Sequence, residues 1–419
     1  MLVHWIWLAH RPGLSDRMKY VLLQHFSNPE DVYFASAEAY SRVEGMTAAA
    51  AKHLQDKDLA EAEKILGDAM QMKLHILTCR DTQYPARLLH IPDPPLVLYY
   101  KGTLPDFNAL PLIGVVGTRK ATPYGLTMAK RLGQEIARCG GVVVSGMAGG
   151  IDSVAMKSAL SAGAPVVGVL GCGADRIYPL SNRSLFADTE RYGCILSEFP
   201  PGAEPFGWHF PRRNRIISGM SSGVLVVEAP EKSGALITAD HAMEQGRDVF
   251  VVPGNLDQPT FVGNNKLLRD GGILVSSGWD ILSEYADRFP GKVRQSGVRS
   301  RQSAYPDEVR AVLSENDETA GKVAQTPTLP RDKSRKKEKS NKKDVDKRTS
   351  ANYSDVNKDN CALTAQQQRI VDVLRGGERL VDQLIAEVGL PAGQVSSALT
   401  MLAIRGIVKK LPGNRVSLK

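Results

Sequence analysis

The chain has 419 residues, 42% of them hydrophobic and 23% charged, and this composition is typical of a globular protein of two or three domains. It contains no run of about 18 apolar residues, so we expect no membrane-spanning helix. Of the net charge of +8, the segment 331–348 contributes +6, because it holds ten Lys/Arg and four Asp/Glu. We interpret this segment as a solvated linker, with weak attraction to nucleic acid as the alternative.

Residues 1–75 are predicted to form a small helical domain. The first 13 residues are apolar, but they lack a basic leading stretch and a small-residue cleavage site, so we expect no signal peptide. The chain's five cysteines are scattered and form no C-x-x-C pair, so we expect reduced thiols in a cytoplasmic protein, neither zinc ligands nor disulfides. Helical spacing predicts helices at 14–26, 35–41 and 48–55. The turns RPGLS and VEGMT resemble those of helix–hairpin–helix units, which present N–H groups to DNA phosphates. A plain helical bundle is the alternative.

Residues 76–288 are predicted to form the central domain. From about residue 110 to 283, short apolar runs alternate with helical stretches. Strands are expected at 112–117, 141–146, 165–170, 193–198, 223–229, 248–254 and 272–276. Helices are expected at 124–140, 151–163, 180–193, 211–221, 235–246 and 265–272. Near-continuous apolar strands that alternate with helices predict an α/β fold, with a doubly wound, Rossmann-like, mostly parallel sheet.

The C-terminal third is predicted to contain a linker and a winged helix. Residues 289–360 lack periodicity and are rich in Ser, Asp, Lys and Arg, so we expect a basic disordered linker. Residues 361–419 show three helical stretches and a hairpin with a turn at 412–414, which is the pattern of a winged helix. Its predicted core is formed by Leu374, Leu384, Ile385, Val395, Leu399 and Leu402. Its third helix is poor in Arg and Lys, so protein contact and DNA binding both stay open.

Glycine-rich turns follow the first two strands of the predicted central sheet. The first turn is Gly117-Thr118-Arg119-Lys120, and the second begins at Ser145-Gly146 and continues through Gly149-Gly150. Ligands of doubly wound sheets bind at the carboxyl ends of the strands, where such turns direct N–H groups at an anion. Several such turns with Arg and Lys suggest an extended polyanion. Tight packing of helix on strand is the alternative.

The segment HFPRRNRIISGM places three arginines in the first turn of a predicted helix, at 212, 213 and 215. The positive end of the helix dipole disfavours cations there, so an anion is expected nearby. A phosphate bound by Arg212 and Arg215, three residues apart on one helix face, would satisfy them. The alternative is a structural ion-pair cluster with Glu198, Glu228 or Asp175.

No catalytic constellation is recognisable. The chain has no G-x-x-x-x-G-K-[ST] motif and its glycine turn is not of the G-x-G-x-x-G form, which argues against ATP hydrolysis and a dinucleotide cofactor. His209 and His241 are interpreted as packed residues, and Asp152 and Asp175 as capping or turn residues. We therefore expect neither a cofactor nor enzymatic activity. A nucleotide hydrolase of the phosphoribohydrolase type stays as the alternative function, although its P-G-G-x-G-T-x-x-E motif is not found.

The motifs GVVGTRKATPYG, VVSGMAGGIDSVAM, FPRRNRIISG, EKSGALITADHA and GNNKLLRDGG resemble those of the DNA-processing protein A (Smf) family. The resemblance runs in one order from about residue 84 to 277. It implies an extended Rossmann core that binds single-stranded DNA without catalysis, loads the RecA recombinase in natural transformation and recombination, and forms homodimers. The resemblance also allows for single-strand binding protein as a partner. It further implies a sterile-alpha-motif-like N-terminal domain and a C-terminal winged helix.

The resemblance also implies which residues contact DNA, motif by motif. This chain has Thr118 where members of the family have serine, and Gly272 where we would expect alanine. The implied DNA-binding residues are Gly117, Thr118, Arg119, Lys120, Ser145, Gly146, Gly149, Gly150, Arg212, Arg213, Asn214, Arg215, Asn264 and Lys266.

Overall fold

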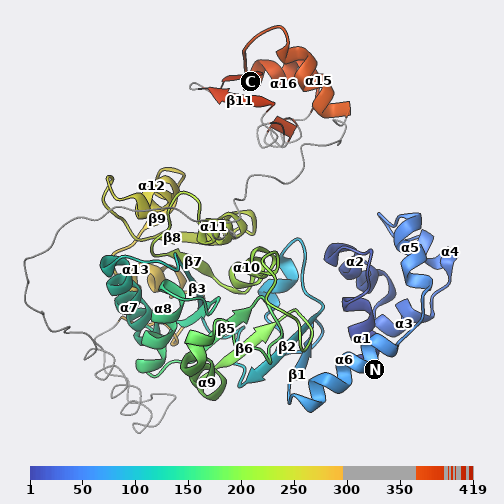
Figure 1. Cartoon of the computed structure of the whole chain (residues 1–419), viewed down its shortest axis with the longest axis horizontal. Helices are drawn as coiled ribbons and strands as arrows, with labels where there is room; N and C mark the ends of the chain where they lie inside the picture. Colours follow the sequence, from blue (N-terminus) through green and yellow to red (C-terminus); the bar gives the residue numbers. More distant parts are fainter. Residues whose placement is uncertain are drawn as a thin grey trace, which may run out of the picture. The chain divides into compact units, whose positions relative to one another are not determined.

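The computed structural model describes residues 1–295, 365–390, 395, 398–399, 402, 407–411 and 415–418. The chain divides into two units, Met1–Thr326 and Pro327–Lys419, each with its own hydrophobic core (Figure 1). None of the helices in the described part of the chain is long and apolar enough to cross a membrane. The predicted linker lies outside the described residues except for 289–295, where Phe289 is buried and the N–H of Arg294 donates to the carbonyl of Cys139.

Six helices precede the sheet. They are α1 Leu2–Ala9, α2 Asp16–Phe26, α3 Pro29–Phe34, α4 Ala37–Ser41, α5 Ala48–Gln55 and α6 Ala60–Gln71. The apolar N-terminal stretch is α1, whose Ile6, Trp7 and Leu8 are buried. Side chains of Ser15, Asn28, Ser36 and Thr47 accept hydrogen bonds from the first turns of α2 to α5, and such caps define where these short helices begin. The helices share one continuous hydrophobic core with the sheet.

A nine-stranded sheet forms the centre of the first unit, in the order β1-β2-β6-β5-β4-β3-β7-β8-β9. The strands are β1 His75–Thr78, β2 Val97–Gly102, β3 Leu112–Val116, β4 Val142–Ser145, β5 Val166–Leu170, β6 Cys194–Ser197, β7 Gly223–Val226, β8 Asp248–Val251 and β9 Ile273–Leu274. Strands β3 to β9 are parallel to one another, with β4 to β6 on one side of β3 and β7 to β9 on the other. This confirms the predicted doubly wound, mostly parallel sheet.

Helices cover both faces of the sheet, which explains why every residue of β3 to β7 is buried. In one layer α7 Pro123–Arg138 packs on α8 Ile151–Ser161 and α13 Gly278–Leu282, and α8 packs on α9 Arg183–Tyr192. In the other, α10 His209–Met220 packs on α11 Gly234–Glu244 (Figure 1). Helix α12 Val262–Arg269 follows β8. Short 3₁₀ helices lie at η1 Ala86–His90, η2 Leu180–Asn182, η3 Pro259–Phe261 and η4 Ser283–Tyr285.

Strands β1 and β2 are a feature that alternation did not predict. They pair antiparallel with each other, and β2 pairs antiparallel with β6, with Tyr99 opposite Ser197. They extend the parallel sheet on the side where the N-terminal helices pack. The Nε2 atom of His10 lies 2.8 Å from the hydroxyl of Tyr99, which joins the end of α1 to β2.

The second unit has the helices α15 Ala365–Leu374 and α16 Val381–Val388 and a three-stranded antiparallel sheet. Its strands are β10 Arg379–Leu380, β11 Val408–Leu411 and β12 Arg415–Leu418. The predicted core is confirmed: Leu374, Leu384, Val395, Leu399 and Leu402 are buried, and Ile385 is partly buried against them. Most of the predicted third helix and the turn at 412–414 lie outside the described residues.

Candidate nucleic-acid interface

The switch point of the sheet, where the strand order reverses, lies between β3 and β7. A buried carboxylate lies at this point. Glu228, just after β7, accepts hydrogen bonds at Oε2 from the N–H and the hydroxyl of Thr122, both at 3.0 Å. Thr122 caps α7, so the carboxylate lies against the positive end of that helix. A Cβ on Gly125 would lie 1.8 Å from Oε2, so only glycine fits there. The point where a doubly wound sheet binds a dinucleotide therefore holds a buried carboxyl group that is already hydrogen-bonded within the protein.

A cavity of about 180 Å³ opens instead beside the ends of β4 and β5, and we name it the Phe210 cavity. Its lining combines glycine turns, aromatic rings and two arginines: Arg119, Gly146, Ala148, Gly149, Leu170, Gly171, Cys172, Tyr178, Pro179, Phe210 and Arg213. The guanidinium carbons of Arg119 and Arg213 lie 5.6 and 6.0 Å from the centre of the Phe210 ring. The centre of the Tyr178 ring lies 5.5 Å from the centre of the Phe210 ring.

Arg213 carries a buried positive charge in the wall of this cavity. Its Nη1 donates to the carbonyl of Gly146 at 2.9 Å and to that of Val169. Burial lowers the pKa of Arg213 to about 10, and the charge of Asp152 opposes that shift. The guanidinium is therefore protonated at neutral pH. A charge held so deep exerts a stronger field than one at the surface, because less water screens it.

The side chains of Asp152 and Asn182 hydrogen-bond to the backbone of the turn between β4 and α8. Asp152 Oδ2 accepts the N–H of Gly146 at 3.1 Å, and Asn182 donates to the carbonyl of Met147 at 2.9 Å. Met147 and Gly150 have φ of 56° and 79°, so two residues of the turn are in the left-handed region. Gly149 differs, since an added Cβ would meet nothing within 4 Å and would point into open space.

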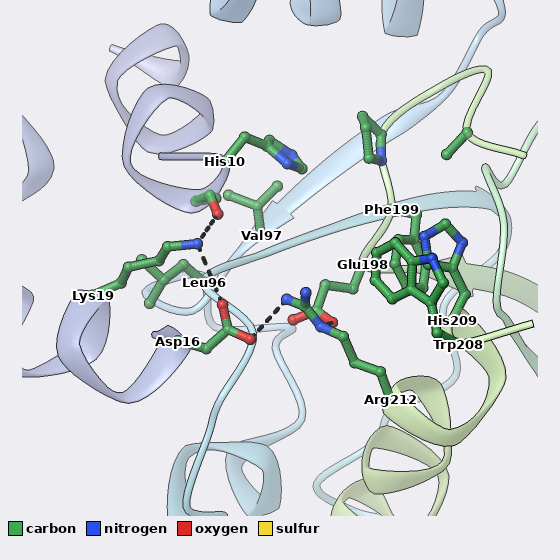
Figure 2. Close-up of a pocket in the computed structure, with 13 residues that line it drawn as sticks. His10, Asp16, Lys19, Leu96, Val97, Glu198, Phe199, Trp208, His209 and Arg212 are labelled. Carbon is green, nitrogen blue, oxygen red and sulfur yellow. Dashed lines mark hydrogen bonds and ion pairs between the residues drawn. The ribbon is translucent and has the colours of Figure 1, made fainter. Parts of the chain in front are cut away.

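A second cavity, of about 260 Å³, lies beside the end of β6, and we name it the Trp208 cavity (Figure 2). It is lined by the N-terminal helices, the start of β2 and the loop that leads into α10: Ala9, His10, Asp16, Lys19, Leu96, Val97, Glu198, Phe199, Pro200, Ala203, Trp208, His209 and Arg212. Trp208 is 62% exposed. His209 lies 3.9 Å from Phe199 in a stack and 4.0 Å from Trp208 in an edge contact, measured between ring centres.

Carboxylates accompany the arginines of α10. Arg212 Nη2 lies 2.7 Å from Asp16 Oδ2, and its Nε lies 3.2 Å from Glu198 Oε2. Arg215 Nη2 lies 3.3 Å from Asp16 Oδ2 and also pairs with Glu198. The Arg215 side chain is only 9% exposed, whereas that of Arg212 is 38% exposed. The ion-pair alternative, with Glu198 as partner, therefore describes Arg215, and Arg212 is paired but still reaches solvent.

The predicted DNA-binding residues fall into groups. Those that line the Phe210 cavity are Arg119, Gly146, Gly149 and Arg213, and Arg212 lines the Trp208 cavity. Residues of the adjoining turns that line neither cavity are Gly117, Thr118, Lys120 and Gly150. Buried residues with structural contacts are Ser145, Asn214, Arg215 and Asn264. Lys266 is exposed on α12 and also lines neither cavity.

Asn264 illustrates how burial separates a structural asparagine from a contact residue. Its Oδ1 accepts the N–H of Ala229 at 2.7 Å, and its Nδ2 donates to the carbonyl of Val252 at 2.8 Å, among other carbonyls. It is fully buried. Both polar atoms of its side chain hydrogen-bond to backbone groups, so Asn264 is not part of the proposed DNA surface.

The aromatic residues of the interface were missed from sequence. Phe210 stands directly before the Pro-Arg-Arg sequence, and an aromatic residue among arginines is the signal that could have identified it. Tyr178 and Trp208 stand in loops without regular spacing, and only the structure places their rings at the cavities.

Comparisons with known proteins identify the family of this chain. Residues 75–286 match the family model described as DNA recombination-mediator protein A, and residues 357–414 match that of the DprA winged helix domain. Protein Smf of Synechocystis is 33% identical over 98% of this chain and 97% of its own length. DNA processing protein DprA of Bacillus subtilis is 41% identical over 58% of this chain and 81% of its own. The crystal structure of DNA processing protein A from Streptococcus pneumoniae superposes with a TM-score of 0.60 at 34% identity, covering 68% of this chain and 98% of that one.

Proposed function

This chain belongs to the DNA recombination-mediator protein A family, also called DprA or Smf, and has a DNA-processing role; we propose that it fulfils this role by binding single-stranded DNA at the Phe210 cavity. Family membership confirms the resemblance recognised in the sequence. The binding mode and the residues assigned to it are our proposal.

The observation that carries the proposal is the ring of Phe210, with Arg119 of the turn after β3 5.6 Å away and Arg213 of α10 6.0 Å away. Single strands are bound by aromatic rings that stack on bases and by cations that follow the backbone. The bases of a duplex are already stacked and paired, so their faces are not available to such a ring. Arg119 and Lys120 are exposed and would contact phosphates beside the cavity.

We test this with a labelled oligonucleotide and its duplex over a range of salt concentrations. Phe210→Ala should weaken single-strand binding about tenfold or more, because stacking of one base contributes roughly 1–3 kcal/mol. Arg119→Gln should reduce the slope of log K against log salt by about 0.7, the value for one phosphate contact on a single strand. The matched control is Arg191→Gln, which removes an exposed arginine just before β6, at the opposite edge of the sheet. Unchanged affinity and slope in the first two variants would contradict the proposal.

We propose that binding occurs without catalysis. Glu228 lies at the switch point and its Oε2 is already engaged by the N–H and the hydroxyl of Thr122, so this carboxyl group is not free to act on a nucleotide. Incubation with nucleoside monophosphates, followed by chromatography, should give no free base. Release at enzymatic rates would favour the phosphoribohydrolase alternative.

We also propose that the bound strand is passed to the RecA recombinase in the cytoplasm, during natural transformation and recombination. This rests on membership of a recombination-mediator family. RecA filaments should form faster on oligonucleotides covered by single-strand binding protein when this protein is present. The acceleration should be lost with Phe210→Ala.

A homodimer is the assembly we propose. Strand β9 ends the sheet, and Ile273 and Leu274 on it are 39% and 58% exposed. An exposed apolar strand at a sheet edge tends to pair with another chain. Sedimentation should show a dimer for the wild type and a monomer for Leu274→Arg.

A further inference from the structure

We infer that the Trp208 cavity is a second base-binding subsite, which takes a nucleobase of the same single strand that occupies the Phe210 cavity. The inference rests on the proposed function and extends it to a cavity that contains only one of the predicted residues, Arg212.

The first turn of α10 separates the two cavities. His209 and Arg212, three residues apart, line the Trp208 cavity, whereas Phe210 and Arg213, also three apart, line the Phe210 cavity. Residues three apart lie on one face of a helix, so one face at the start of α10 borders the Trp208 cavity and the neighbouring face borders the Phe210 cavity. The Nδ1 atom of His209 lies 3.1 Å from the carbonyl of Gly171, which belongs to the Phe210 cavity.

Both cavities open at the same edge of the sheet. The Phe210 cavity contains residues just after β4 and β5, and the Trp208 cavity contains Glu198 and Phe199, just after β6. Since β4, β5 and β6 are adjacent and parallel, their carboxyl ends lie side by side. A strand of DNA that leaves one cavity along this edge reaches the other by crossing a single helical turn.

The wall of the Trp208 cavity has the chemistry of a base-stacking surface. Trp208, which lines the cavity, is 62% exposed, and Phe206, in the adjoining loop, is 55% exposed, although large aromatic side chains favour burial. Each lies against the buried ring of His209, and the centre of the Phe206 ring is 5.5 Å from it. Ring contacts of this kind hold an exposed indole in place, so less entropy is lost when a base stacks on it.

The charges of the cavity favour a base inside it and a phosphate at its mouth. The two cations that line the cavity, Lys19 and Arg212, are each paired with a carboxylate, as Figure 2 shows for Asp16, so neither is free to hold a phosphate inside the cavity. Burial lowers the pKa of His10 to about 4, so its ring is neutral. The Arg212 side chain is 38% exposed and its guanidinium lies 5.9 Å from the centre of the Phe199 ring, beside the aromatic wall. At about 260 Å³ the space is smaller than the ~300–1,000 Å³ of pockets for drug-sized ligands, and it suits a single base.

The test is a length series of labelled oligothymidylates of about 4 to 16 nucleotides. Trp208→Ala should leave the affinity for the shortest oligonucleotides unchanged and weaken that for longer ones about tenfold, because only these reach both cavities. Trp208→Phe keeps a ring and should restore most of the affinity. Phe34→Ala, which removes an exposed aromatic residue on α3, is the matched control.

Tryptophan fluorescence provides a second readout. A long oligonucleotide should quench the part of the emission that comes from Trp208. This quenching should appear in the wild type and in Trp279→Phe and should be absent from Trp208→Phe. Trp208→Ala that binds every length as the wild type does, or that loses affinity equally at every length, would overturn the second subsite. A wild type that binds no single-stranded DNA would instead overturn the proposed function, so the two failures are distinguishable.

Discussion

Asp16 Oδ2 lies 2.7 Å from Nη2 of Arg212, so a carboxylate at the start of α2 holds an arginine in the first turn of α10, 196 residues away. The same oxygen lies 3.3 Å from Nη2 of Arg215. Helix α10 begins at His209, two residues before the predicted start, so Arg212 is its fourth residue and Arg215 its seventh. The anion that offsets these two arginines comes from the protein. If Arg212 binds a phosphate as we propose, Asp16 competes with that phosphate for its guanidinium.

We therefore predict that Asp16→Asn increases affinity for single-stranded DNA severalfold and lowers stability. The affinity rises because the competing negative charge is removed from Arg212. The free energy of unfolding falls by about 1–3 kcal/mol, because the largely buried Arg215 loses one of its charged partners. Oligonucleotide titration and urea unfolding measure the two effects.

The control for this variant is Glu63→Gln, which removes one negative charge from an exposed position on α6. It should change neither quantity appreciably, because exposed charges are screened by solvent and salt. Equal gains in affinity for both variants would show that net charge acts, and would contradict a specific competition at Arg212.

Two glycines of the turn after β4 should respond differently to substitution. Gly149→Leu should preserve the fold, because an added Cβ meets nothing within 4 Å, and should weaken DNA binding at least tenfold, because the side chain fills the Phe210 cavity. Gly146→Ala should lower the melting temperature, because its Cβ would lie 2.5 Å from Nη2 of the buried Arg213. Calorimetry and oligonucleotide titration separate the two outcomes.

Gly67→Leu serves as the matched control for Gly149→Leu. Gly67 lies in α6, an added Cβ there also meets nothing within 4 Å, and the residue lines neither cavity. DNA affinity should stay at the wild-type value. A loss of affinity equal to that of Gly149→Leu would refute the assignment of the cavity.

His10 should make the stability of the protein depend on pH. Burial lowers the pKa of His10 from 6.5 to about 4, with Lys19 and Arg212 acting in the same direction and Asp16 opposing them. Between these values the unfolded chain binds a proton that the folded protein does not, so stability is fully present above pH 6.5 and is lost as the pH falls toward 4. At pH 5 the loss should be about 2 kcal/mol, since each pKa unit corresponds to about 1.4 kcal/mol.

The measurement compares urea unfolding of the wild type and His10→Gln at pH 7 and pH 5. Glutamine does not titrate, so the variant should lose about 2 kcal/mol less than the wild type over this interval. All other titrating groups are common to both proteins and cancel in the comparison. Equal losses would mean that His10 does not carry the effect.

Much of the fold could be predicted because its signals are local. Apolar runs of four or five residues, each followed by a helical stretch, required a parallel sheet covered on both faces, and β3 to β8 lie within the predicted ranges. Strands β1 and β2 escaped this reasoning, because their antiparallel pairing with each other and with β6 has no counterpart in the alternation along the chain. The helix α1 was also missed, since a stretch as apolar as Leu2–Ala9 shows no polar face from which a helical period could be read.

What the sequence by itself determined is the doubly wound sheet, the glycine turns at its carboxyl edge and the concentration of arginines that begins α10. Only the tertiary structure decided which arginines reach the surface and which anions they contact. Arg213 faces the Phe210 cavity, and Arg215 is buried against Glu198. Arg212 contacts Asp16, and part of its side chain is exposed to solvent. The physical reason is that local spacing determines which face of a helix a side chain occupies. The opposite charge that this side chain contacts belongs to residues distant in the chain. The packing of the N-terminal helices on the sheet brings these residues close.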